Sequence, residues 1–151
     1  MKKSVFLIAA LLLAPPFSAR GQDLPPSTRP SAPIEIVRYT NHAESDGEPV
    51  WSPDGKWMAF VSSRSGNSDL WIKPVAGGDA RQVTSDPAYD RSPEWSPDGK
   101  LIGFMSERGD QWNLWTIDPF GGPKTLRQLS TEADSVKGGQ FDWSPAGREI
   151  V

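Results

Sequence analysis

Trp51-Ser52-Pro53-Asp54-Gly55-Lys56 decides the fold, because the same six residues return as Trp95-Ser96-Pro97-Asp98-Gly99-Lys100. An altered copy, Trp143-Ser144-Pro145-Ala146-Gly147-Arg148, follows close to the end of the sequence. The second copy stands 44 residues after the first, and the third stands 48 residues after the second. A six-residue match at nearly constant spacing indicates an array of structural repeats.

Each copy is typical of a tight turn between two strands. Pro sets φ at the first central position, Asp bonds the local backbone, and Gly accepts a positive φ. The first repeat is expected over 48–84, with strands at 48–51, 56–62, 69–75 and 81–84. Apolar residues fall on both faces of 56–62, which predicts a strand covered on both sides.

The second repeat is expected over 92–130 with the same order of strands, and a third begins at 140–151 and reaches only its second strand. Residues 34–40 alternate and are rich in β-branched side chains, so they also predict a strand. Thr40 lies 11 residues before Trp51, as Thr84 lies 11 before Trp95. Residues 34–40 are therefore expected to form an outer strand of a repeat whose beginning is missing.

The N-terminus has the pattern of a secretory signal. Lys2 and Lys3 precede an apolar run that is too short to span a bilayer, and small residues follow. We expect residues 1–21 to be a signal peptide cleaved after Gly21, with an uncleaved membrane anchor as the alternative. Residues 22–33 contain four prolines and predict an extended, Pro-rich linker. The localisation implied is periplasmic or secreted.

Composition excludes several classes of function. The chain of 151 residues contains no cysteine, so disulfides, thiolate metal sites and thiol nucleophiles are ruled out. The net charge is −3, and it becomes −6 once the three basic residues of 1–21 are removed. That balance argues against nucleic acid or an anionic membrane as a partner. Many Gly, Pro and Trp residues favour an all-β fold.

The repeat closely resembles the WD40-like repeat of the TolB family, which also occurs in the propellers of prolyl-oligopeptidase-like peptidases. The residues that carry it are the Trp-Ser-Pro-Asp-Gly-Lys turns, the Gly77-Gly78 and Gly121-Gly122 pairs, and the Gln82-Val83-Thr84 ending. The resemblance covers 34–151. It implies a β-propeller of four-stranded antiparallel blades, in which the repeated Trp and Asp residues have structural roles; Ala146 departs from the pattern.

Such propellers form closed rings, whereas this sequence supplies about two and a half blades. We therefore expect a truncated product or a fragment of a longer reading frame. The alternative is completion of the ring by self-association through uncovered blade faces.

The sequence predicts no catalytic, cofactor-binding or metal-binding residue, and it assigns no binding residue. No Gly-x-Ser-x-Gly turn is present, and the single histidine, His42, lacks a nucleophile or ligand cluster. The loops 65–69 and 109–113 offer oxygen atoms but match no ordered calcium loop. Trp51, Trp71, Trp95 and Trp115 recur and are expected in the core, whereas Trp112 has no counterpart and is expected to be exposed.

The favoured hypothesis is a TolB-like, non-catalytic interaction scaffold that binds protein partners of the cell envelope, without membrane insertion after signal cleavage. One alternative is the N-terminal propeller remnant of a secreted prolyl-oligopeptidase-like serine peptidase that lacks its catalytic domain. A stand-alone sugar- or calcium-binding module is the third possibility.

Overall fold

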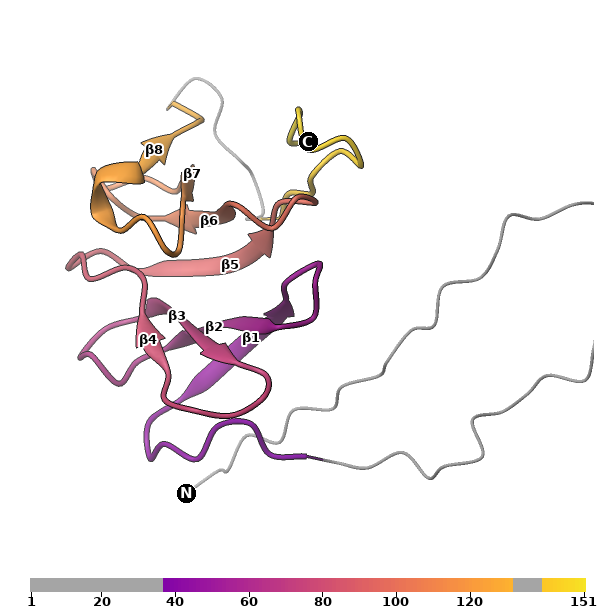
Figure 1. Cartoon of the computed structure of the whole chain (residues 1–151). Helices are drawn as coiled ribbons and strands as arrows, with labels where there is room; N and C mark the ends of the chain where they lie inside the picture. The colour runs from indigo at the N-terminus through magenta and orange to yellow at the C-terminus, as the bar shows by residue number, and fades with distance from the viewer. Residues whose placement is uncertain (1–36, 132–139) are drawn as a thin grey trace, which may run out of the picture. The chain divides into compact units, whose positions relative to one another are not determined.

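The computed structural model describes residues 37–131 and 140–151. These residues form two four-stranded antiparallel sheets, with strand orders β1-β2-β3-β4 and β5-β6-β7-β8 (Figure 1). The strands are β1 (Asp46–Trp51), β2 (Trp57–Ser62), β3 (Asp69–Pro74), β4 (Arg81–Gln82), β5 (Asp90–Trp95), β6 (Ile102–Ser106), β7 (Asn113–Ile117) and β8 (Arg127–Gln128). One short 3₁₀ helix, η1 (Pro123–Thr125), precedes β8. Each sheet is one propeller blade, so the expected all-β propeller with four-stranded antiparallel blades is confirmed, and the described residues contain two complete blades.

The repeated hexapeptide forms the turn between the first two strands of each blade. In the first copy the Ser52 N–H donates to the Trp57 carbonyl at 2.8 Å, and the Ser52 hydroxyl donates to Asp54 Oδ1 at 2.6 Å. Asp54 Oδ1 also accepts the Lys56 N–H at 3.0 Å. Gly55 has a φ of 68°, where a side chain would strain the backbone. The Ser and Asp side chains therefore close the turn that Gly permits.

The main core lies between the two blades. Ala59, Leu70 and Ile72 of the first blade pack in one cluster with residues of the second. The cluster consists of Ala59, Leu70, Ile72, Val83, Trp95, Ile102, Phe104 and Ile117. On the other face of β2, Met58 and Phe60 are buried as well, which confirms that this strand is covered on both sides. Burial on both faces explains the nearly continuous apolar runs of β2 and β6.

A third hairpin begins after the second blade. Trp143 pairs with Ile150 in an antiparallel bridge, and Asp142 and Val151 exchange two backbone hydrogen bonds at 2.9 and 3.0 Å. The Ser144 N–H donates to the Glu149 carbonyl at 2.8 Å, as in the first two turns. This third turn lacks the Asp carboxylate because Ala146 stands in its place.

The structure changes several expected boundaries. The blades run from Asp46 to Gln82 and from Asp90 to Gln128, about two residues earlier than the expected 48–84 and 92–130. Residues 37–40, the described part of the expected strand at 34–40, form no strand, and neither sheet supplies a partner strand for them. A strand without a neighbour leaves its backbone groups without ladder hydrogen bonds. The expected signal peptide (1–21) and linker (22–33) lie outside the described residues.

Within the described parts of the chain, no helix is both long enough and apolar enough to cross a membrane.

Candidate functional site

The first strand of each blade carries a β-bulge at the same repeat position. The pairing of β1 with β2 shifts between Gly47 and Val50, and that of β5 with β6 shifts between Arg91 and Glu94. The bulged residues Glu48 and Ser92 have φ values of 51° and 53°, in the left-handed region. Bulges redirect side chains and are frequent beside functional sites. Because both bulges fall at the same repeat position, the two first strands present the same local geometry.

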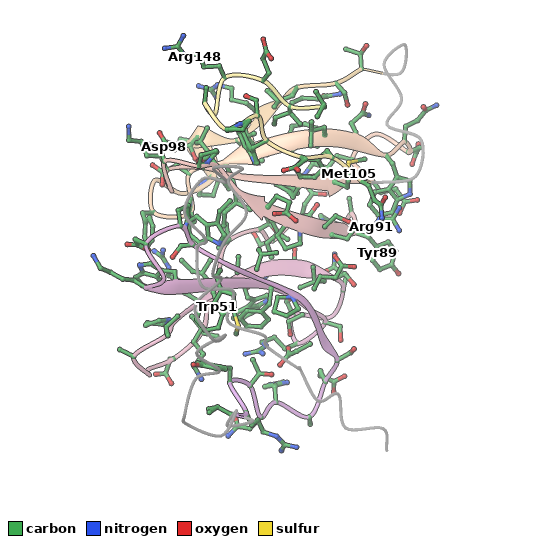
Figure 2. All side chains as sticks on the ribbon, turned by 90° about the vertical axis from the view of Figure 1, so that its right-hand side faces the viewer. Trp51, Tyr89, Arg91, Asp98, Met105 and Arg148 are labelled. Carbon is green, nitrogen blue, oxygen red and sulfur yellow. The ribbon has the colours of Figure 1, made fainter. Side chains whose placement is uncertain are left out.

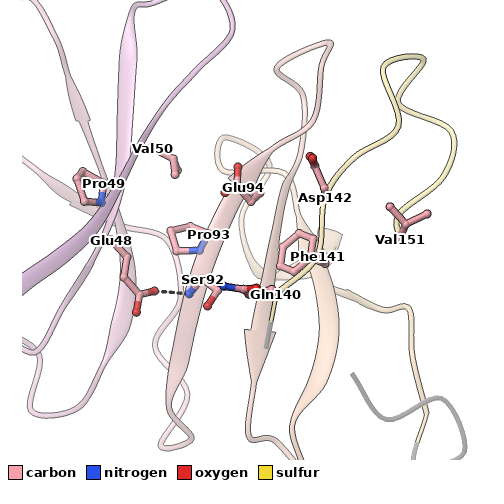
Figure 3. A pocket seen from close by; sticks show the side chains of 10 residues that line it. All are labelled: Glu48, Pro49, Val50, Ser92, Pro93, Glu94, Gln140, Phe141, Asp142 and Val151. Carbon is pink, nitrogen blue, oxygen red and sulfur yellow. Dashed lines mark hydrogen bonds between the residues drawn. The ribbon is translucent and has the colours of Figure 1, made fainter. Parts of the chain in front are cut away.

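The two bulges contact each other. A carboxylate oxygen of Glu48 accepts a hydrogen bond from the backbone N–H of Ser92, as the dashed line in Figure 3 shows. This contact joins the first strands of neighbouring blades directly. The next blade has Gln140 at the same position, three residues before its repeated Trp.

A groove of about 830 Å³ runs along these bulged strands (Figure 3). It is bounded by β1, by β5 and by the third hairpin. We call it the inner groove; its lining consists of Glu48, Pro49, Val50, Ser92, Pro93, Glu94, Gln140, Phe141, Asp142 and Val151. Three of these side chains are carboxylates, and none is Lys, Arg or His. The groove therefore combines apolar side chains with negative charge.

The carboxylates of the inner groove influence one another. Burial raises the pKa of Glu94 above its ordinary value, and the negative charge of Asp142 adds to the rise. Both effects disfavour the ionised form. A cationic group placed in the groove would relieve that repulsion, so the electrostatics favour a basic ligand surface.

The third hairpin is held against the second blade by two aromatic side chains. The indole N–H of Trp143 donates to the Glu94 carbonyl at 3.3 Å. Phe141 packs so closely on Gly103 that a Cβ built there would lie 2.8 Å from the ring. Gly103 thus makes room for Phe141, which in turn forms one wall of the inner groove.

A second repeated cluster is structural. Arg64 makes a bidentate pair with Asp46, at 2.7 and 2.9 Å, donates to Ser62, and lies 4.8 Å from the centre of the Trp71 ring. Both members of this ion pair are largely buried. Such a pair fixes the start of the blade's first strand onto the hairpin between its second and third strands.

The second blade repeats this cluster 44 residues later. Arg108 bonds both oxygens of Asp90 at 3.0 and 3.1 Å, donates to Ser106, and lies 5.4 Å from the Trp115 ring centre. Its Nε also lies 3.3 Å from Asp86 Oδ2. Sequence reasoning missed both clusters, although the spacing of 44 residues between identical Asp, Ser and Arg residues could have revealed them.

The residues considered from the sequence as possible catalytic or calcium-binding groups make contacts that are ordinary in turns and loops. His42 is exposed, and its Nδ1 accepts the Glu44 N–H at 3.3 Å. In the second repeat Asp86 makes the same turn contact with the Ala88 N–H. Within the loop 65–69, the buried Asp69 carboxylate accepts the Ser65 hydroxyl at 2.6 Å. Among the residues that the structure describes, no group of three or more His, Cys, Asp or Glu side chains could hold a metal ion.

The tryptophans differ in exposure from what the sequence predicts. Of the four repeated ones, only Trp95 is buried, while Trp51, Trp71 and Trp115 are half-buried.

Trp112 is half-buried too, because the Arg91 guanidinium lies 3.9 Å from its ring centre. An arginine on the neighbouring strand, where the first repeat has Gly47, covers the ring that we expected to be exposed.

The inner groove itself was not predicted. Its residues belong to three repeats and come together only when the blades pack side by side. A usable signal did exist: a Pro follows the bulge in the first two repeats, at Pro49 and Pro93. Pro inside a strand marks an edge or a bulge.

Comparison with known proteins identifies the fold. A family model described as "TolB beta propeller domain" matches residues 32–151. A solved structure of TolB from Acinetobacter baumannii superposes with a TM-score of 0.59 and 28% sequence identity, covering 69% of this chain and 25% of that one. A putative TolB from Agrobacterium tumefaciens gives a TM-score of 0.61 at 24% identity, over 73% of this chain and 38% of that one. At 24% identity, the similarity to the Agrobacterium tumefaciens structure concerns the fold alone.

Two kinds of curated relatives match shorter stretches. The Tol-Pal system protein TolB of Escherichia coli is 49% identical over 41 residues, 27% of this chain and 10% of the relative. An uncharacterized peptidase, YuxL of Bacillus subtilis, is 42% identical over 52 residues, 34% of this chain and 8% of the relative. The chain thus spans a tenth or less of the length of these relatives.

Proposed function

The chain belongs to the TolB beta propeller domain family, and we propose that it is a non-catalytic, protein-binding propeller module of the cell envelope. The inner groove is its binding surface. The observation that carries the proposal is the recurrence of a bulge in neighbouring first strands, where Glu48 and Ser92 contact each other. A bulge that recurs and aims polar groups into a groove is suited to holding a ligand.

The chemistry of the groove favours a protein partner with a basic segment. Glu48, Glu94 and Asp142 supply negative charge, and Pro49, Pro93 and Phe141 supply apolar contact area. Partly apolar surfaces with charge at the rim are typical of protein interfaces. The acidic net charge of the chain supports a protein rather than a nucleic acid as the partner.

The compartment is part of the proposal. Residues 1–21 have the signal pattern described above, which favours a periplasmic or secreted protein with envelope proteins as partners. The Tol-Pal system name of the TolB relatives is consistent with an envelope role. Self-association through blade faces is a secondary mode of interaction within the same proposal.

A charge-matched capture experiment tests the binding surface. The purified protein is immobilised and exposed to envelope extract from the source organism, and a captured protein is then measured by calorimetry. The variant Glu48→Gln/Glu94→Gln/Asp142→Asn should weaken binding about tenfold. The control Asp79→Asn/Glu107→Gln/Asp110→Asn removes the same charge outside the groove and should leave the affinity unchanged. Equal losses in the two variants would refute the proposed surface.

The peptidase alternative is favoured by one observation, the 42% identity to the uncharacterized peptidase YuxL. In that case the blades would belong to the propeller of a serine peptidase. Sequencing the DNA beyond codon 151 distinguishes the two: a Gly-x-Ser-x-Gly frame downstream favours the peptidase, and blades alone favour the scaffold.

A further inference from the structure

A second, smaller hollow lies between the repeated turns of the two blades and shares no lining residue with the inner groove. We call it the turn cleft; it has a volume of about 380 Å³. Three aromatic side chains, Trp57, Trp95 and Phe120, contribute to its walls, together with the turn residues Asp54 and Asp98. We propose that the turn cleft binds a trimethylammonium cation, of the kind carried by choline and its derivatives.

The aromatic walls are unusual for this repeat. Phe120 occupies the position held by Ala76 in the first repeat, so it is not a residue that every blade requires. It is 49% exposed and lies edge to face with Trp57, with ring centres 5.1 Å apart. An exposed aromatic ring that bridges two blades supplies a surface for a ligand rather than for the core.

The Phe120 ring already contacts one cation, Arg81, which does not itself line the turn cleft. The Arg81 guanidinium lies 5.2 Å from the centre of the Phe120 ring and donates to the Pro119 carbonyl at 2.7 Å. Cation–π attraction depends on the ring quadrupole, and quaternary ammonium groups are recognised in this way by clustered aromatic rings. Arg81 itself adds positive charge near the cleft, so the carboxylates must supply the opposing charge.

The two carboxylates are fixed in place by their turns. Each accepts the hydroxyl of the preceding Ser and a backbone N–H, at 2.6 and 3.0 Å for Asp54 and at 2.7 and 3.1 Å for Asp98. These hydrogen bonds lower the pKa of both Asp54 and Asp98, so both are ionised at neutral pH. Their lysine partners, Lys56 and Lys100, are 76% and 80% exposed. Such exposed pairs are weak and exchange readily.

The next gap between repeats lacks these groups. There Leu101 stands at the position of Trp57, and Ala146 stands at the position of Asp98. Only the gap between the first two described blades therefore combines aromatic walls with two carboxylates. That difference argues for a ligand at one gap and not for a feature common to all blades.

Titration calorimetry with choline tests the proposal, and 3,3-dimethyl-1-butanol serves as the neutral probe of the same shape. Choline should bind, and the neutral alcohol should bind at least tenfold more weakly, because it keeps the shape and loses the charge. Phe120→Ala should weaken choline binding at least fivefold. Tyr89→Ala, which removes an aromatic ring of similar exposure at the other end of the second blade (Figure 2), should not.

Two further measurements test the role of the carboxylates and the source of the cation. Asp54→Asn/Asp98→Asn should weaken choline binding, whereas Asp110→Asn should leave it unchanged; circular dichroism confirms that the variants fold. Binding to phosphatidylcholine vesicles but not to phosphatidylglycerol vesicles would assign the cation to a lipid headgroup, and binding of free choline alone would assign it to a soluble compound. The proposal would be overturned if neither free choline nor phosphatidylcholine vesicles bind, or if the neutral alcohol binds as tightly as choline. It would also be overturned if Tyr89→Ala weakens choline binding as much as Phe120→Ala does.

Discussion

Glu48 accepts a hydrogen bond from the backbone N–H of Ser92, and this contact joins the bulges of β1 and β5. The two residues stand 44 positions apart, which is the length of one repeat. A side chain of one blade thus contacts the backbone of the next at the corresponding position. The inner groove is built from the repeat itself, because Glu48, Ser92 and Gln140 line it from the same repeat position.

The repeated turns also contact each other across the blades. The Pro53 ring lies 3.6 Å from the place where a Cβ on Gly99 would stand, and Gly99 has a φ of 71°. Gly99→Ala should lower the free energy of unfolding by about 1–2 kcal/mol, because an L side chain is strained at this φ. Urea denaturation measures the effect. Gly47→Ala is the matched control: nothing lies within 4 Å of its Cβ position, and its backbone is not left-handed. An equal loss of stability in Gly99→Ala and Gly47→Ala would contradict the claim that the left-handed backbone at residue 99 requires glycine.

The buried ion pair of the second blade should be sensitive to the loss of one charge. Asp90 is fully buried, and the Arg108 side chain is 13% exposed. Asp90→Asn should lower the free energy of unfolding by about 3 kcal/mol or more, because it leaves the Arg108 charge without its bidentate partner. The double variant Asp90→Leu/Arg108→Met should recover much of this loss. A single variant as stable as the wild type in urea would show that the pair does not hold the blade together.

Glu94 should make stability depend on pH in the weakly acidic range. Its pKa is raised above the ordinary value of 4.5, so the folded state holds the proton more tightly than the unfolded state. The wild type should therefore lose stability as pH rises through the range between these two pKa values. Glu94→Gln should flatten this part of the curve, and Asp142→Asn should flatten it less, because Asp142 is the smaller cause. Urea midpoints from about pH 4 to about pH 8 test both, with Glu107→Gln as the control. If the stability of Glu94→Gln changes with pH in parallel with that of the wild type, Glu94 is not the cause of the pH dependence.

The third turn should be improved by restoring the repeated carboxylate. Ser144 Oγ already accepts the Glu149 N–H at 3.1 Å, as Ser52 and Ser96 do in their own turns. Ala146→Asp should add the hydrogen bonds that Asp98 makes and raise the free energy of unfolding by about 0.5–1 kcal/mol. Urea denaturation measures this as a slightly higher midpoint. Ala146→Asn is a useful second variant, since it offers an acceptor without charge. No gain from either change would show that the hairpin is limited by its packing on Gly103.

The blade architecture could be predicted because each blade is encoded locally. The hexapeptide fixes a turn through Pro, Asp and Gly, and the apolar runs on either side encode strands covered on both faces. The expected strand at 34–40 is described only for residues 37–40, which form no strand. Sequence alternation predicts a strand from local pattern, whereas a strand forms only when a neighbouring strand pairs with it.

The candidate sites were harder to predict because they arise between repeats. Glu48, Glu94 and Asp142 come from three repeats and meet only when the blades pack side by side. Phe120 and Trp57 belong to different blades in the same way. Comparing each residue with its equivalent one repeat away would have marked Phe120, since Ala76 shows that the fold does not require an aromatic ring there.

Hydrogen exchange of the protein with and without its captured partner tests the central claim most directly. If the inner groove is the binding surface, the backbone amides of Gly47, Glu48, Val50, Arg91, Ser92, Glu94 and residues 140–142 should become protected on binding. The outer strands β4 and β8 should exchange as they do in the free protein. Protection confined to β4 and β8, with the first strands unchanged, would contradict the account.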